Sequence, residues 1–444
     1  MRVPFLVRFA RHRKLGTENG RVRNPIQSGA DCKGCICART TGDTAGNGIF
    51  VPGRHCVDDI VSPADVYAPW PTMKPCHRSV INLFDTLIFG SNLMKKVLIL
   101  GVNGFIGHHL SRRILETTDW HVYGMDMMSD RITELLDNEA FKPRLHFFEG
   151  DIMINKEWVE YHVKKCDVIL PLVAIATPST YVKEPLRVFE LDFEANLPIV
   201  RSAAKYGKHL VFPSTSEVYG MVEDKEFDPA ESNLVYGPIS KQRWIYACSK
   251  QLMDRVIWAY GAEQDLNFTL FRPFNWIGAG LDSIHTAKEG SSRVLTQFLG
   301  HIVRGENISL VDGGRQKRAF TYIDDGIAAL MKIIANQDGV ATGKIYNIGN
   351  PDNNFSIREL AEMMLAHARD YPEYVEMAGK VQLIETSSDA YYGNGYQDVQ
   401  NRVPKITGTC RELDWQPATS MAEALAHIFE AYRSEVAQAK ALIQ

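Results

Sequence analysis

The stretch KVLILGVNGFIG, residues 96–107, decides the fold class of this chain. Its first five residues form a short apolar run after a lysine, which predicts a buried parallel strand followed at once by a glycine-rich turn. The glycines of the turn are Gly101, Gly104 and Gly107, and the apolar positions of the helix expected after it are Phe105, Ile106, Leu110 and Ile114. Glycines permit a tight turn and a close approach of the backbone. A pyrophosphate is therefore expected at the helix N-terminus, where free N–H groups and the helix dipole favour an anion.

A second apolar run, residues 121–125, ends in Asp126, which lies 19 residues after Gly107. A carboxylate at this distance from a glycine turn is typical of the group that binds the ribose diol of NAD. Because an acid there also repels a 2′-phosphate, the sequence favours NAD over NADP. The alternative is a glycine turn used only for packing.

Three further apolar runs, residues 145–151, 168–174 and 208–212, alternate with helical stretches. This alternation predicts an α/β fold with a Rossmann-type, doubly wound parallel sheet. Ligands of such sheets bind outside the carboxyl ends of the strands. We therefore expect Asp151, residues 174–176 and residues 214–217 to surround one crevice.

The sequence divides into three predicted parts. Residues 94–280 form the predicted NAD-binding domain, and residues 281–444 form a smaller α/β domain that binds the substrate. In the second part, helical stretches near 293–303, 325–335, 357–367 and 421–437 alternate with short strands, which predicts a cap and not a second large sheet. Residues 1–93 are expected to be a poorly ordered extension that is dispensable, with Met94 as the working start.

Composition excludes several classes of protein. The chain has 444 residues, a net charge of -4 and 45% hydrophobic residues, so neither a small disulfide scaffold nor a disordered chain is expected. No apolar run approaches the ~20 residues of a membrane-spanning helix. Five of the eight cysteines lie in residues 1–93, and the sparse remainder predicts a reduced, cytoplasmic protein.

Residues 1–93 hold 12 Lys and Arg against 7 Asp and Glu. Their charges are not clustered with aromatic residues, which disfavours a nucleic-acid-binding arm. Cys32, Cys35 and Cys37 are spaced like part of a zinc knuckle, but no well-spaced second ligand pair follows them. No metal site is predicted.

Tyr246 and Lys250 lie in a helical stretch predicted from about residue 243 to 260. Residues at i and i+4 share a helix face, so the ammonium can stabilise the phenolate and lower the tyrosine pKa from its ordinary value of ~10. Such a pair is a proton acceptor for an alcohol that loses hydride. Tyr161 and Lys165 repeat the spacing, but they lie on a charged helix away from the crevice, which predicts a solvated face.

Several strings of sequence resemble the extended short-chain dehydrogenases that act on nucleotide sugars. They are the glycine turn, Asp126, STSEVYG at 214–220, the Tyr246 and Lys250 pair, and RPFN at 272–275. The resemblance is closer still to the UDP-glucuronate decarboxylating dehydrogenase domains of bifunctional polymyxin-resistance enzymes of the ArnA type, which act in lipid A modification. It covers residues 95–435, including the strings at 171–178 and 391–399. Those enzymes carry a formyltransferase domain ahead of the dehydrogenase domain. Residues 1–93 are too short, and too unlike that domain in sequence, to be a formyltransferase.

The resemblance implies roles for individual residues. Implied cofactor contacts are Gly101, Gly104, Phe105, Ile106, Gly107, Asp126, Asp151, Ile152, Ala174, Tyr246 and Lys250. Implied catalytic residues are Tyr246, Lys250, Thr215, Ser216, Glu217 and Arg402. Implied substrate contacts are Tyr181, Asn275, Arg293, Arg318, Tyr396 and Arg402, the arginines being suited to a diphosphate and a sugar carboxylate. Ser309 departs from the lysine of the resembled enzymes.

The implied activity is NAD-dependent oxidation of UDP-glucuronate at C4 and decarboxylation to UDP-4-keto-pentose, carbon dioxide and NADH. Tyr246 would take the hydroxyl proton, and Glu217 and Arg402 would assist the second stage. For Glu217, a purely structural hydrogen bond to nearby backbone is the alternative. The alternative activities are UDP-xylose synthesis with the NADH retained, 4-epimerisation, and an NAD-binding sensor without turnover. The resemblance also implies a homodimer, paired through the helical stretches near 186–206 and 243–260 as a four-helix bundle.

Overall fold

The computed structural model describes residues 94–285, 292–393 and 395–436. The chain divides into two units, Met1–Leu87 and Ile88–Gln444, and everything below concerns the second. The predictions for residues 1–93, including the extension and its cysteine motif, lie outside the described residues.

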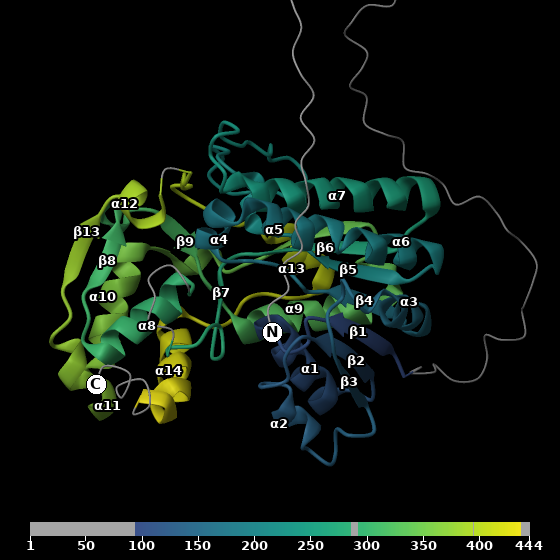
Figure 1. The fold of residues 1–444 in the computed structure, drawn as a ribbon, viewed down its shortest axis with the longest axis horizontal. Coiled ribbons are helices and arrows are strands. Elements are labelled where there is room, and N and C mark those ends of the chain that lie inside the picture. Colours follow the sequence, from purple (N-terminus) through teal and green to yellow (C-terminus); the bar gives the residue numbers. More distant parts are fainter. Residues whose placement is uncertain (1–93, 286–291, 394, 437–444) are drawn as a thin grey trace, which may run out of the picture. The chain divides into compact units, whose positions relative to one another are not determined.

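Seven parallel strands form the main sheet, in the order β11-β6-β5-β4-β1-β2-β3 (Figure 1). The strands are β1 (Lys96–Leu100), β2 (His121–Asp126), β3 (Leu145–Glu149), β4 (Val168–Pro171), β5 (His209–Pro213), β6 (Phe268–Pro273) and β11 (Lys344–Ile348). Strand order reverses at β1, which pairs with β2 on one side and β4 on the other, so a crevice opens there at the carboxyl ends. The predicted doubly wound sheet is confirmed.

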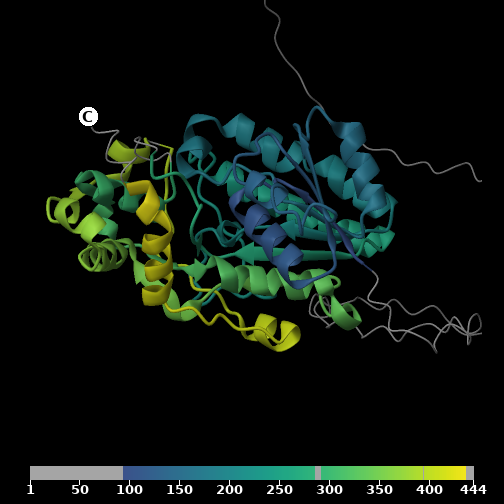
Figure 2. The same cartoon turned by 90° about the horizontal axis from the view of Figure 1, so that it is seen from below.

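Side chains alternate between the two faces of the sheet because successive residues of a strand point to opposite sides. On β1, Val97 and Ile99 pack with α1 (Phe105–Thr117) and α9 (Ile323–Ala335), whereas Leu98 and Leu100 pack with α3 (Lys156–Lys165), α6 (Leu197–Lys205) and α7 (Trp244–Gln264). Figure 2 shows α1 and α9 side by side on one face, and the two helices are in contact. The sheet is therefore buried on both faces, which is why its strands read as continuous apolar runs.

Two strands of the sheet lie outside the five apolar runs. Strand β6 ends within the RPFN string, and β11 lies beyond residue 280 yet pairs with β6. Helix α9 also lies beyond residue 280 and covers the sheet next to α1. The division of domains at residue 280 stays a prediction, but the chain past it supplies part of the sheet that precedes it.

The rest of the C-terminal half builds a cap of small sheets and helices, seen at one end of Figure 1. Each of its sheets has two strands: β7 (Trp276–Ile277) with β10 (Thr321–Tyr322), β9 (Lys317–Ala319) with β12 (Asn354–Ser356), and β8 (Ile308–Val311) with β13 (Leu383–Thr386). Its helices are α8 (Val294–Arg304), α10 (Ile357–Ala368), α11 (Pro372–Ala378), α12 (Ser388–Tyr392) and α14 (Met421–Tyr432). Serine caps start two of these helices, with reciprocal Glu bonds at Ser356 and Ser420.

The remaining elements are short helices and turns. They are α2 (Thr133–Leu136), α4 (Pro178–Lys183), α5 (Pro185–Phe189), α13 (Thr407–Leu413), the π-helical turn η1 (Glu190–Glu194) and the 3₁₀ turns η2 (Ser216–Tyr219), η3 (Asp312–Gly314), η4 (Gln337–Gly339), η5 (Pro351–Asn353) and η6 (Arg433–Glu435). Among the described helices, none combines the length and apolar character that crossing a bilayer requires.

Candidate active site

The glycine turn joins β1 to α1 at the crevice. Gly101 has a φ of +88°, a conformation that favours glycine, and its N–H donates to the Met125 carbonyl of β2 at 2.8 Å. A Cβ on Gly107 would lie 2.3 Å from the Gly101 carbonyl oxygen, so only glycine lets α1 start this close to the turn. Helix α1 has no side-chain cap and no acid in its first turn, which leaves its first N–H groups to an anion. The turn fits a dinucleotide pyrophosphate.

Asp126 ends β2 beside this turn. Its Oδ2 accepts a hydrogen bond from the Asn103 backbone N–H at 2.9 Å, and its Oδ1 accepts from Met127 N–H at 2.8 Å. Burial raises the pKa of Asp126 from its ordinary value, although the backbone hydrogen bonds oppose that rise. Asn103, which the sequence did not single out, ties the turn to the loop after β2 because its Oδ1 accepts from Ile132 N–H at 2.8 Å.

The other predicted cofactor contacts follow β3, β4 and the turn itself. Asp151 and Ile152 come directly after β3, and Ala174 comes directly after β4. Phe105 and Ile106 open α1, and the Phe105 ring lies 5.8 Å from the Arg293 guanidinium carbon. Since β4, β1, β2 and β3 are neighbours in the sheet, these residues gather along one edge.

Tyr246 and Lys250 both lie buried on α7, as predicted, but Lys250 has an additional partner. Its Nζ lies 3.3 Å from Oδ1 of Asp192, and both side chains are buried. Asp192 belongs to the π-helical turn η1 and also accepts the Ile175 N–H at 3.0 Å. The sequence did not single out Asp192.

The expected lowering of the Tyr246 pKa is wrong for the protein by itself. Burial raises the pKa of Tyr246 well above its ordinary value, and the charges of Asp192 and Glu217 raise it further, while a hydrogen bond with Thr215 opposes them. Burial is the largest of these causes, and the charge of Asp192, which also lies 3.3 Å from Lys250, comes next. Tyr246 stacks on Tyr181, with ring centroids 4.6 Å apart and planes 6° from parallel.

The second Tyr-x-x-x-Lys pair lies away from the crevice, as predicted. Tyr161 is exposed on α3, and Lys165 lies over the ring of Tyr123 at 4.1 Å.

Thr215 and Ser216 follow β5 and are buried. Thr215 caps η2, its Oγ1 accepting the Glu217 N–H at 3.2 Å. This turn carries Glu217 from the end of β5 into the adjoining pocket.

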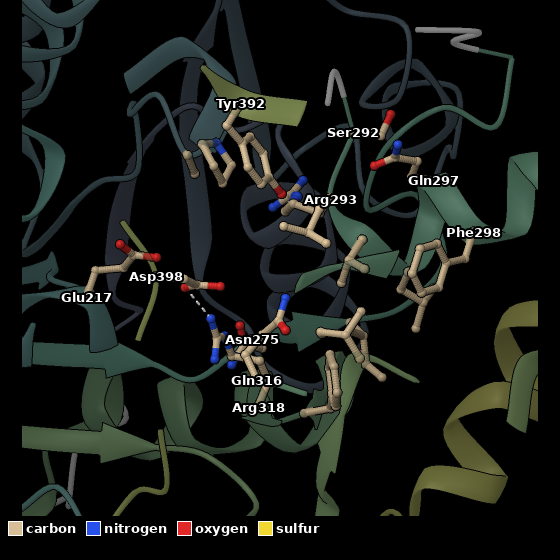
Figure 3. A pocket seen from close by; sticks show the side chains of 18 of the residues that line it. Glu217, Asn275, Ser292, Arg293, Gln297, Phe298, Gln316, Arg318, Tyr392 and Asp398 are labelled. Carbon is tan, nitrogen blue, oxygen red and sulfur yellow. Dashed lines mark hydrogen bonds and ion pairs between the residues drawn. The ribbon is translucent and has the colours of Figure 1, made fainter. Parts of the chain in front are cut away.

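Five of the charged side chains that line the pocket form a series that alternates in sign. Glu217 accepts from Arg243 Nη2 at 2.6 Å and from Arg402 Nη1 at 2.9 Å. Arg402 Nη2 lies 3.9 Å from Asp398, which accepts from Arg318 Nη2 at 2.5 Å. Figure 3 shows Glu217 and Asp398 on one side of the pocket, with the Asp398–Arg318 pair drawn as a dashed line. We call these residues the charge chain: Arg243, Glu217, Arg402, Asp398 and Arg318, all of which line the pocket.

The charge chain determines the ionisation of Glu217. Burial alone would raise the pKa of this carboxyl, but Arg243, Arg402 and Arg318 outweigh it and hold the pKa at about 2. Glu217 is thus an ionised bridge between two arginines and has no proton to deliver near neutral pH. Its carboxylate oxygens accept from guanidinium groups, whereas the structural alternative was a hydrogen bond to nearby backbone.

The other predicted substrate contacts line the same pocket, namely Tyr181, Asn275, Arg293 and Tyr396. Arg293 is paired with Asp282 at 2.8 Å. Asn275 has a φ of +39° and donates its Nδ2 to the Ala319 carbonyl at 3.2 Å, which holds it in a conformation that asparagine tolerates better than most residues. Ser309, the position of departure, also lines the pocket.

Arg243, Asp398 and Asp192 are site residues that sequence reasoning did not assign a role. Arg243 stands directly before α7, and its guanidinium lies over the rings of Trp244 at 4.6 Å and Tyr396 at 5.4 Å. In the sequence, the one feature that pointed to Arg243 as a site residue was its position three residues before Tyr246. For metals, no group of three or more His, Cys, Asp or Glu within residues 94–285, 292–393 and 395–436 is arranged to hold an ion.

Several solved structures resemble this chain in fold. The crystal structure of PbgP3 protein from Burkholderia pseudomallei is 73% identical, covers 79% of this chain and 99% of its own, and superposes with a TM-score of 0.71. A UDP-glucose 4-epimerase from Thermotoga maritima is 22% identical over 77% of this chain and 99% of its own, with a TM-score of 0.61. A dTDP-glucose 4,6-dehydratase from Bacillus anthracis, solved with NAD, is 19% identical over 78% of this chain and 99% of its own, also with a TM-score of 0.61. The last two share the fold.

Residues 97–349, more than half of the chain, match the family described as the NAD dependent epimerase/dehydratase family. The matched segment runs from β1 through β11, and so contains the whole main sheet, the glycine turn and the Tyr246 and Lys250 pair. With its NAD-binding Rossmann-type sheet, the chain belongs to the NAD-dependent epimerase/dehydratase family.

Proposed function

We propose that this enzyme oxidises UDP-glucuronate at C4 with NAD and decarboxylates the product, forming UDP-4-keto-pentose, carbon dioxide and NADH. The observation that carries the proposal is the charge chain. It holds three guanidinium groups against two carboxylates, and its members are buried or nearly so.

An excess positive charge in a buried pocket is costly unless an anion compensates it. Burial and the neighbouring Arg402 lower the pKa of Arg318, as expected where positive charge is in excess. A neutral hexose would leave this part of the pocket uncompensated, whereas a sugar acid brings one carboxylate to it. The proposal therefore favours a uronate over glucose or galactose.

We assign the nucleotide part of the substrate to the side of the pocket that is nearer the cap. Two structural neighbours were solved with UDP-glucose, which supports a nucleotide sugar as the substrate class. Arg293 and Asn275 line the pocket there and offer donors to a diphosphate and a base. Phe105 directly follows Gly104 of the glycine turn, and its ring lies 5.8 Å from the Arg293 guanidinium carbon, so cofactor and substrate would meet near this ring.

The first stage removes the C4 hydroxyl proton and a hydride from C4. Tyr246 accepts the proton, Thr215 holds the phenolic oxygen by a hydrogen bond, and Lys250 supplies a cation one helical turn away. Bound NAD supplies the hydride acceptor and a positively charged ring, which favours the phenolate. Because the protein alone raises the pKa of Tyr246, proton removal depends on the assembled site.

The second stage breaks the C5–C6 bond, because the new ketone is beta to the carboxylate. The bonding electron pair passes to the ketone oxygen as an enolate, which the protonated Tyr246 stabilises by a hydrogen bond. A proton must then reach C5. Glu217 is ionised and cannot give it, so its role is to hold Arg243 and Arg402 beside the carboxylate.

The proposal is tested by NADH formation with a panel of UDP-sugars at equal concentration. UDP-glucuronate should reduce NAD, while UDP-glucose and UDP-galactose should not. Turnover of UDP-glucose to UDP-galactose without net NADH would instead make the chain a 4-epimerase. UDP-xylose formed from UDP-glucuronate without net NADH would show that the ketone is reduced before release.

A further inference from the structure

We propose that Arg131 contacts the pyrophosphate of NAD, in addition to the N-terminus of α1. Neither the sequence nor the resemblance gave this residue a role. The inference rests on the place of its guanidinium and on the lack of a carboxylate partner for it among the described residues. It concerns the cofactor, so it does not depend on which nucleotide sugar the enzyme oxidises.

The backbone of Arg131 is fixed to the glycine turn by Asn103, which belongs to that turn. The Oδ1 of Asn103 accepts the N–H of Arg131 at 2.9 Å and the N–H of Ile132 at 2.8 Å. Its Nδ2 donates to Oδ1 of Asp130 at 2.7 Å. Three hydrogen bonds of one buried side chain therefore hold residues 130–132 beside the turn that fits a pyrophosphate.

The side chain of Arg131 is partly buried and extends toward the segment after β7 and toward α1. A Cβ on Gly280 would lie 3.8 Å from Nη1 of Arg131. Burial is the main cause that lowers the pKa of His108 and of His109 on α1, and Arg131 is among the charges that lower both further. The guanidinium is therefore close to the first turns of α1, the end of the helix that favours an anion.

Charge pairing distinguishes Arg131 from other arginines near the start of α1. Arg112 pairs with Glu134 at 2.6 Å, and Arg293 pairs with Asp282 at 2.8 Å. No carboxylate in the described part of the chain forms an ion pair with Arg131. Its positive charge is therefore available to a ligand, whereas the charges of the other two arginines are already paired.

The groups around Arg131 leave its charge uncompensated. Asp126 and Asp130 belong to the same loop, but both accept hydrogen bonds from the glycine turn, at 2.9 and 2.7 Å. His108 is neutral near pH 7 because its pKa is about 4. Burial raises the pKa of Tyr432 to about 12, so this phenol is neutral as well. A partly buried charge without a partner is unfavourable unless an anion compensates it.

The pyrophosphate of NAD fits this place in charge and in shape. Each of its phosphates carries a negative charge near neutral pH, whereas a helix N-terminus supplies the equivalent of only about half a positive charge. Helix α1 adds no cap and no charged side chain in its first turn. A planar guanidinium can donate two parallel N–H groups to a phosphate. Arg131 thus supplies the cation that the helix end lacks.

The 2′-phosphate of NADP is the other anion that a cation in this loop could bind. Asp126 ends β2, where a carboxylate is typical of the group that binds the ribose diol. Its negative charge would repel a 2′-phosphate, so the pyrophosphate is the expected ligand of Arg131. NADP therefore serves as a probe in the test.

The test measures binding of NAD, ADP, adenosine and NADP to the full chain by calorimetry, with adenosine followed by competition against NAD. Arg131→Gln should weaken binding of NAD and ADP by roughly 10- to 100-fold, the range for a lost hydrogen bond to a charged group. Binding of adenosine, which has no phosphate, should change by less than about two-fold. Because the guanidinium is only partly buried, the loss should shrink at high ionic strength.

Arg112→Gln is the matched control, because Arg112 lies on α1 but pairs with Glu134. It should leave NAD binding within about two-fold of the unmodified protein. Without ligand, Arg131→Gln should unfold within roughly 2 °C of the unmodified protein, since no ion pair is lost. Saturating NAD should raise the Tm of Arg131→Gln less than that of the unmodified protein.

Unchanged NAD affinity in Arg131→Gln would overturn the inference. An equal loss for adenosine would place Arg131 at the adenosine part, and a larger loss for NADP than for NAD would place it at the 2′-phosphate; either result would overturn the pyrophosphate contact. Should Arg131→Gln fail to fold, Arg131→Lys keeps the charge but not the planar fork. It should bind NAD and ADP several-fold more weakly with adenosine binding unchanged, and no loss, or an equal loss for all ligands, would overturn the inference.

Discussion

Glu217→Gln is the substitution that tests the electrostatics of the site most sharply. It removes the negative charge between Arg243 and Arg402 with almost no change of volume. The charge chain would go from one excess positive charge to two, in a place where Arg243 is 1% and Arg402 is 5% exposed. We expect a marked loss of stability at pH 7.

The magnitude follows from the pKa of Glu217, which is lowered from its ordinary value of 4.5 to about 2. At ~1.4 kcal/mol per pKa unit, the ionised carboxylate stabilises the folded protein by about 3 kcal/mol. Breaking a buried ion pair typically costs ~3–5 kcal/mol, which agrees. Because the pKa is lower in the folded state, this stabilisation is complete above about pH 5 and is lost as the pH falls toward 2.

The assay is thermal unfolding followed by circular dichroism between pH 7.5 and 3.5. Glu217→Gln should lower Tm by roughly 3–8 °C at pH 7.5, and the gap to the unmodified protein should narrow below pH 5. The control is Glu184→Gln, which breaks the exposed pair with Arg187 at 2.9 Å and should change Tm by no more than roughly 2 °C. A gap below 1 °C at pH 7.5, or a gap that does not depend on pH, would refute the reasoning.

Four further predictions follow from the site. Tyr246→Phe should lower NAD reduction by ~10²–10⁴-fold and leave UDP-glucuronate binding unchanged, and near-normal turnover would move the proton acceptor elsewhere. Asp192→Asn removes a charge that raises the pKa of Tyr246, so the rise of kcat/KM with pH should move to lower pH. An unchanged pH profile would contradict this effect of Asp192 on Tyr246. Arg402→Met should lower hydride transfer and carbon dioxide release together, by roughly 10- to 100-fold in kcat/KM, whereas loss of only one would separate the two stages. Sedimentation should give a dimer, and a monomeric unmodified protein would contradict this prediction. Trp258 is 53% exposed on α7, and Trp258→Glu should shift the equilibrium from dimer toward monomer.

Much of the main sheet could be predicted because its strands are buried on both faces. Five apolar runs and the glycine turn marked β1 to β5. Strand β11 has the sequence KIYNI, which is short and mixes polar with apolar residues, and it lies 71 residues after β6 ends. Its place in the sheet depends on pairing with β6, and no local sequence pattern indicates that pairing.

The charge chain could not be predicted for a similar reason. Its partners lie far apart in sequence: Glu217 and Arg402 are separated by 185 residues, and Arg318 and Asp398 by 80. Burial of Asp192 depends on the π-helical turn, which sequence reasoning took as part of an ordinary helix. The pKa directions of Tyr246 and Glu217 depend on these contacts, and for that reason the expectation for the Tyr246 pKa needed correction.

The most direct test of the proposed activity uses UDP-glucuronate labelled with ¹³C at C6, incubated with the full chain and excess NAD. NADH, labelled carbon dioxide and the nucleotide-sugar products are followed in the same sample. We predict one labelled carbon dioxide and one free NADH for each UDP-4-keto-pentose. Release of labelled carbon dioxide without free NADH, with UDP-xylose as the main product, would contradict release of the ketone, and retention of the label in the nucleotide sugar would contradict decarboxylation itself.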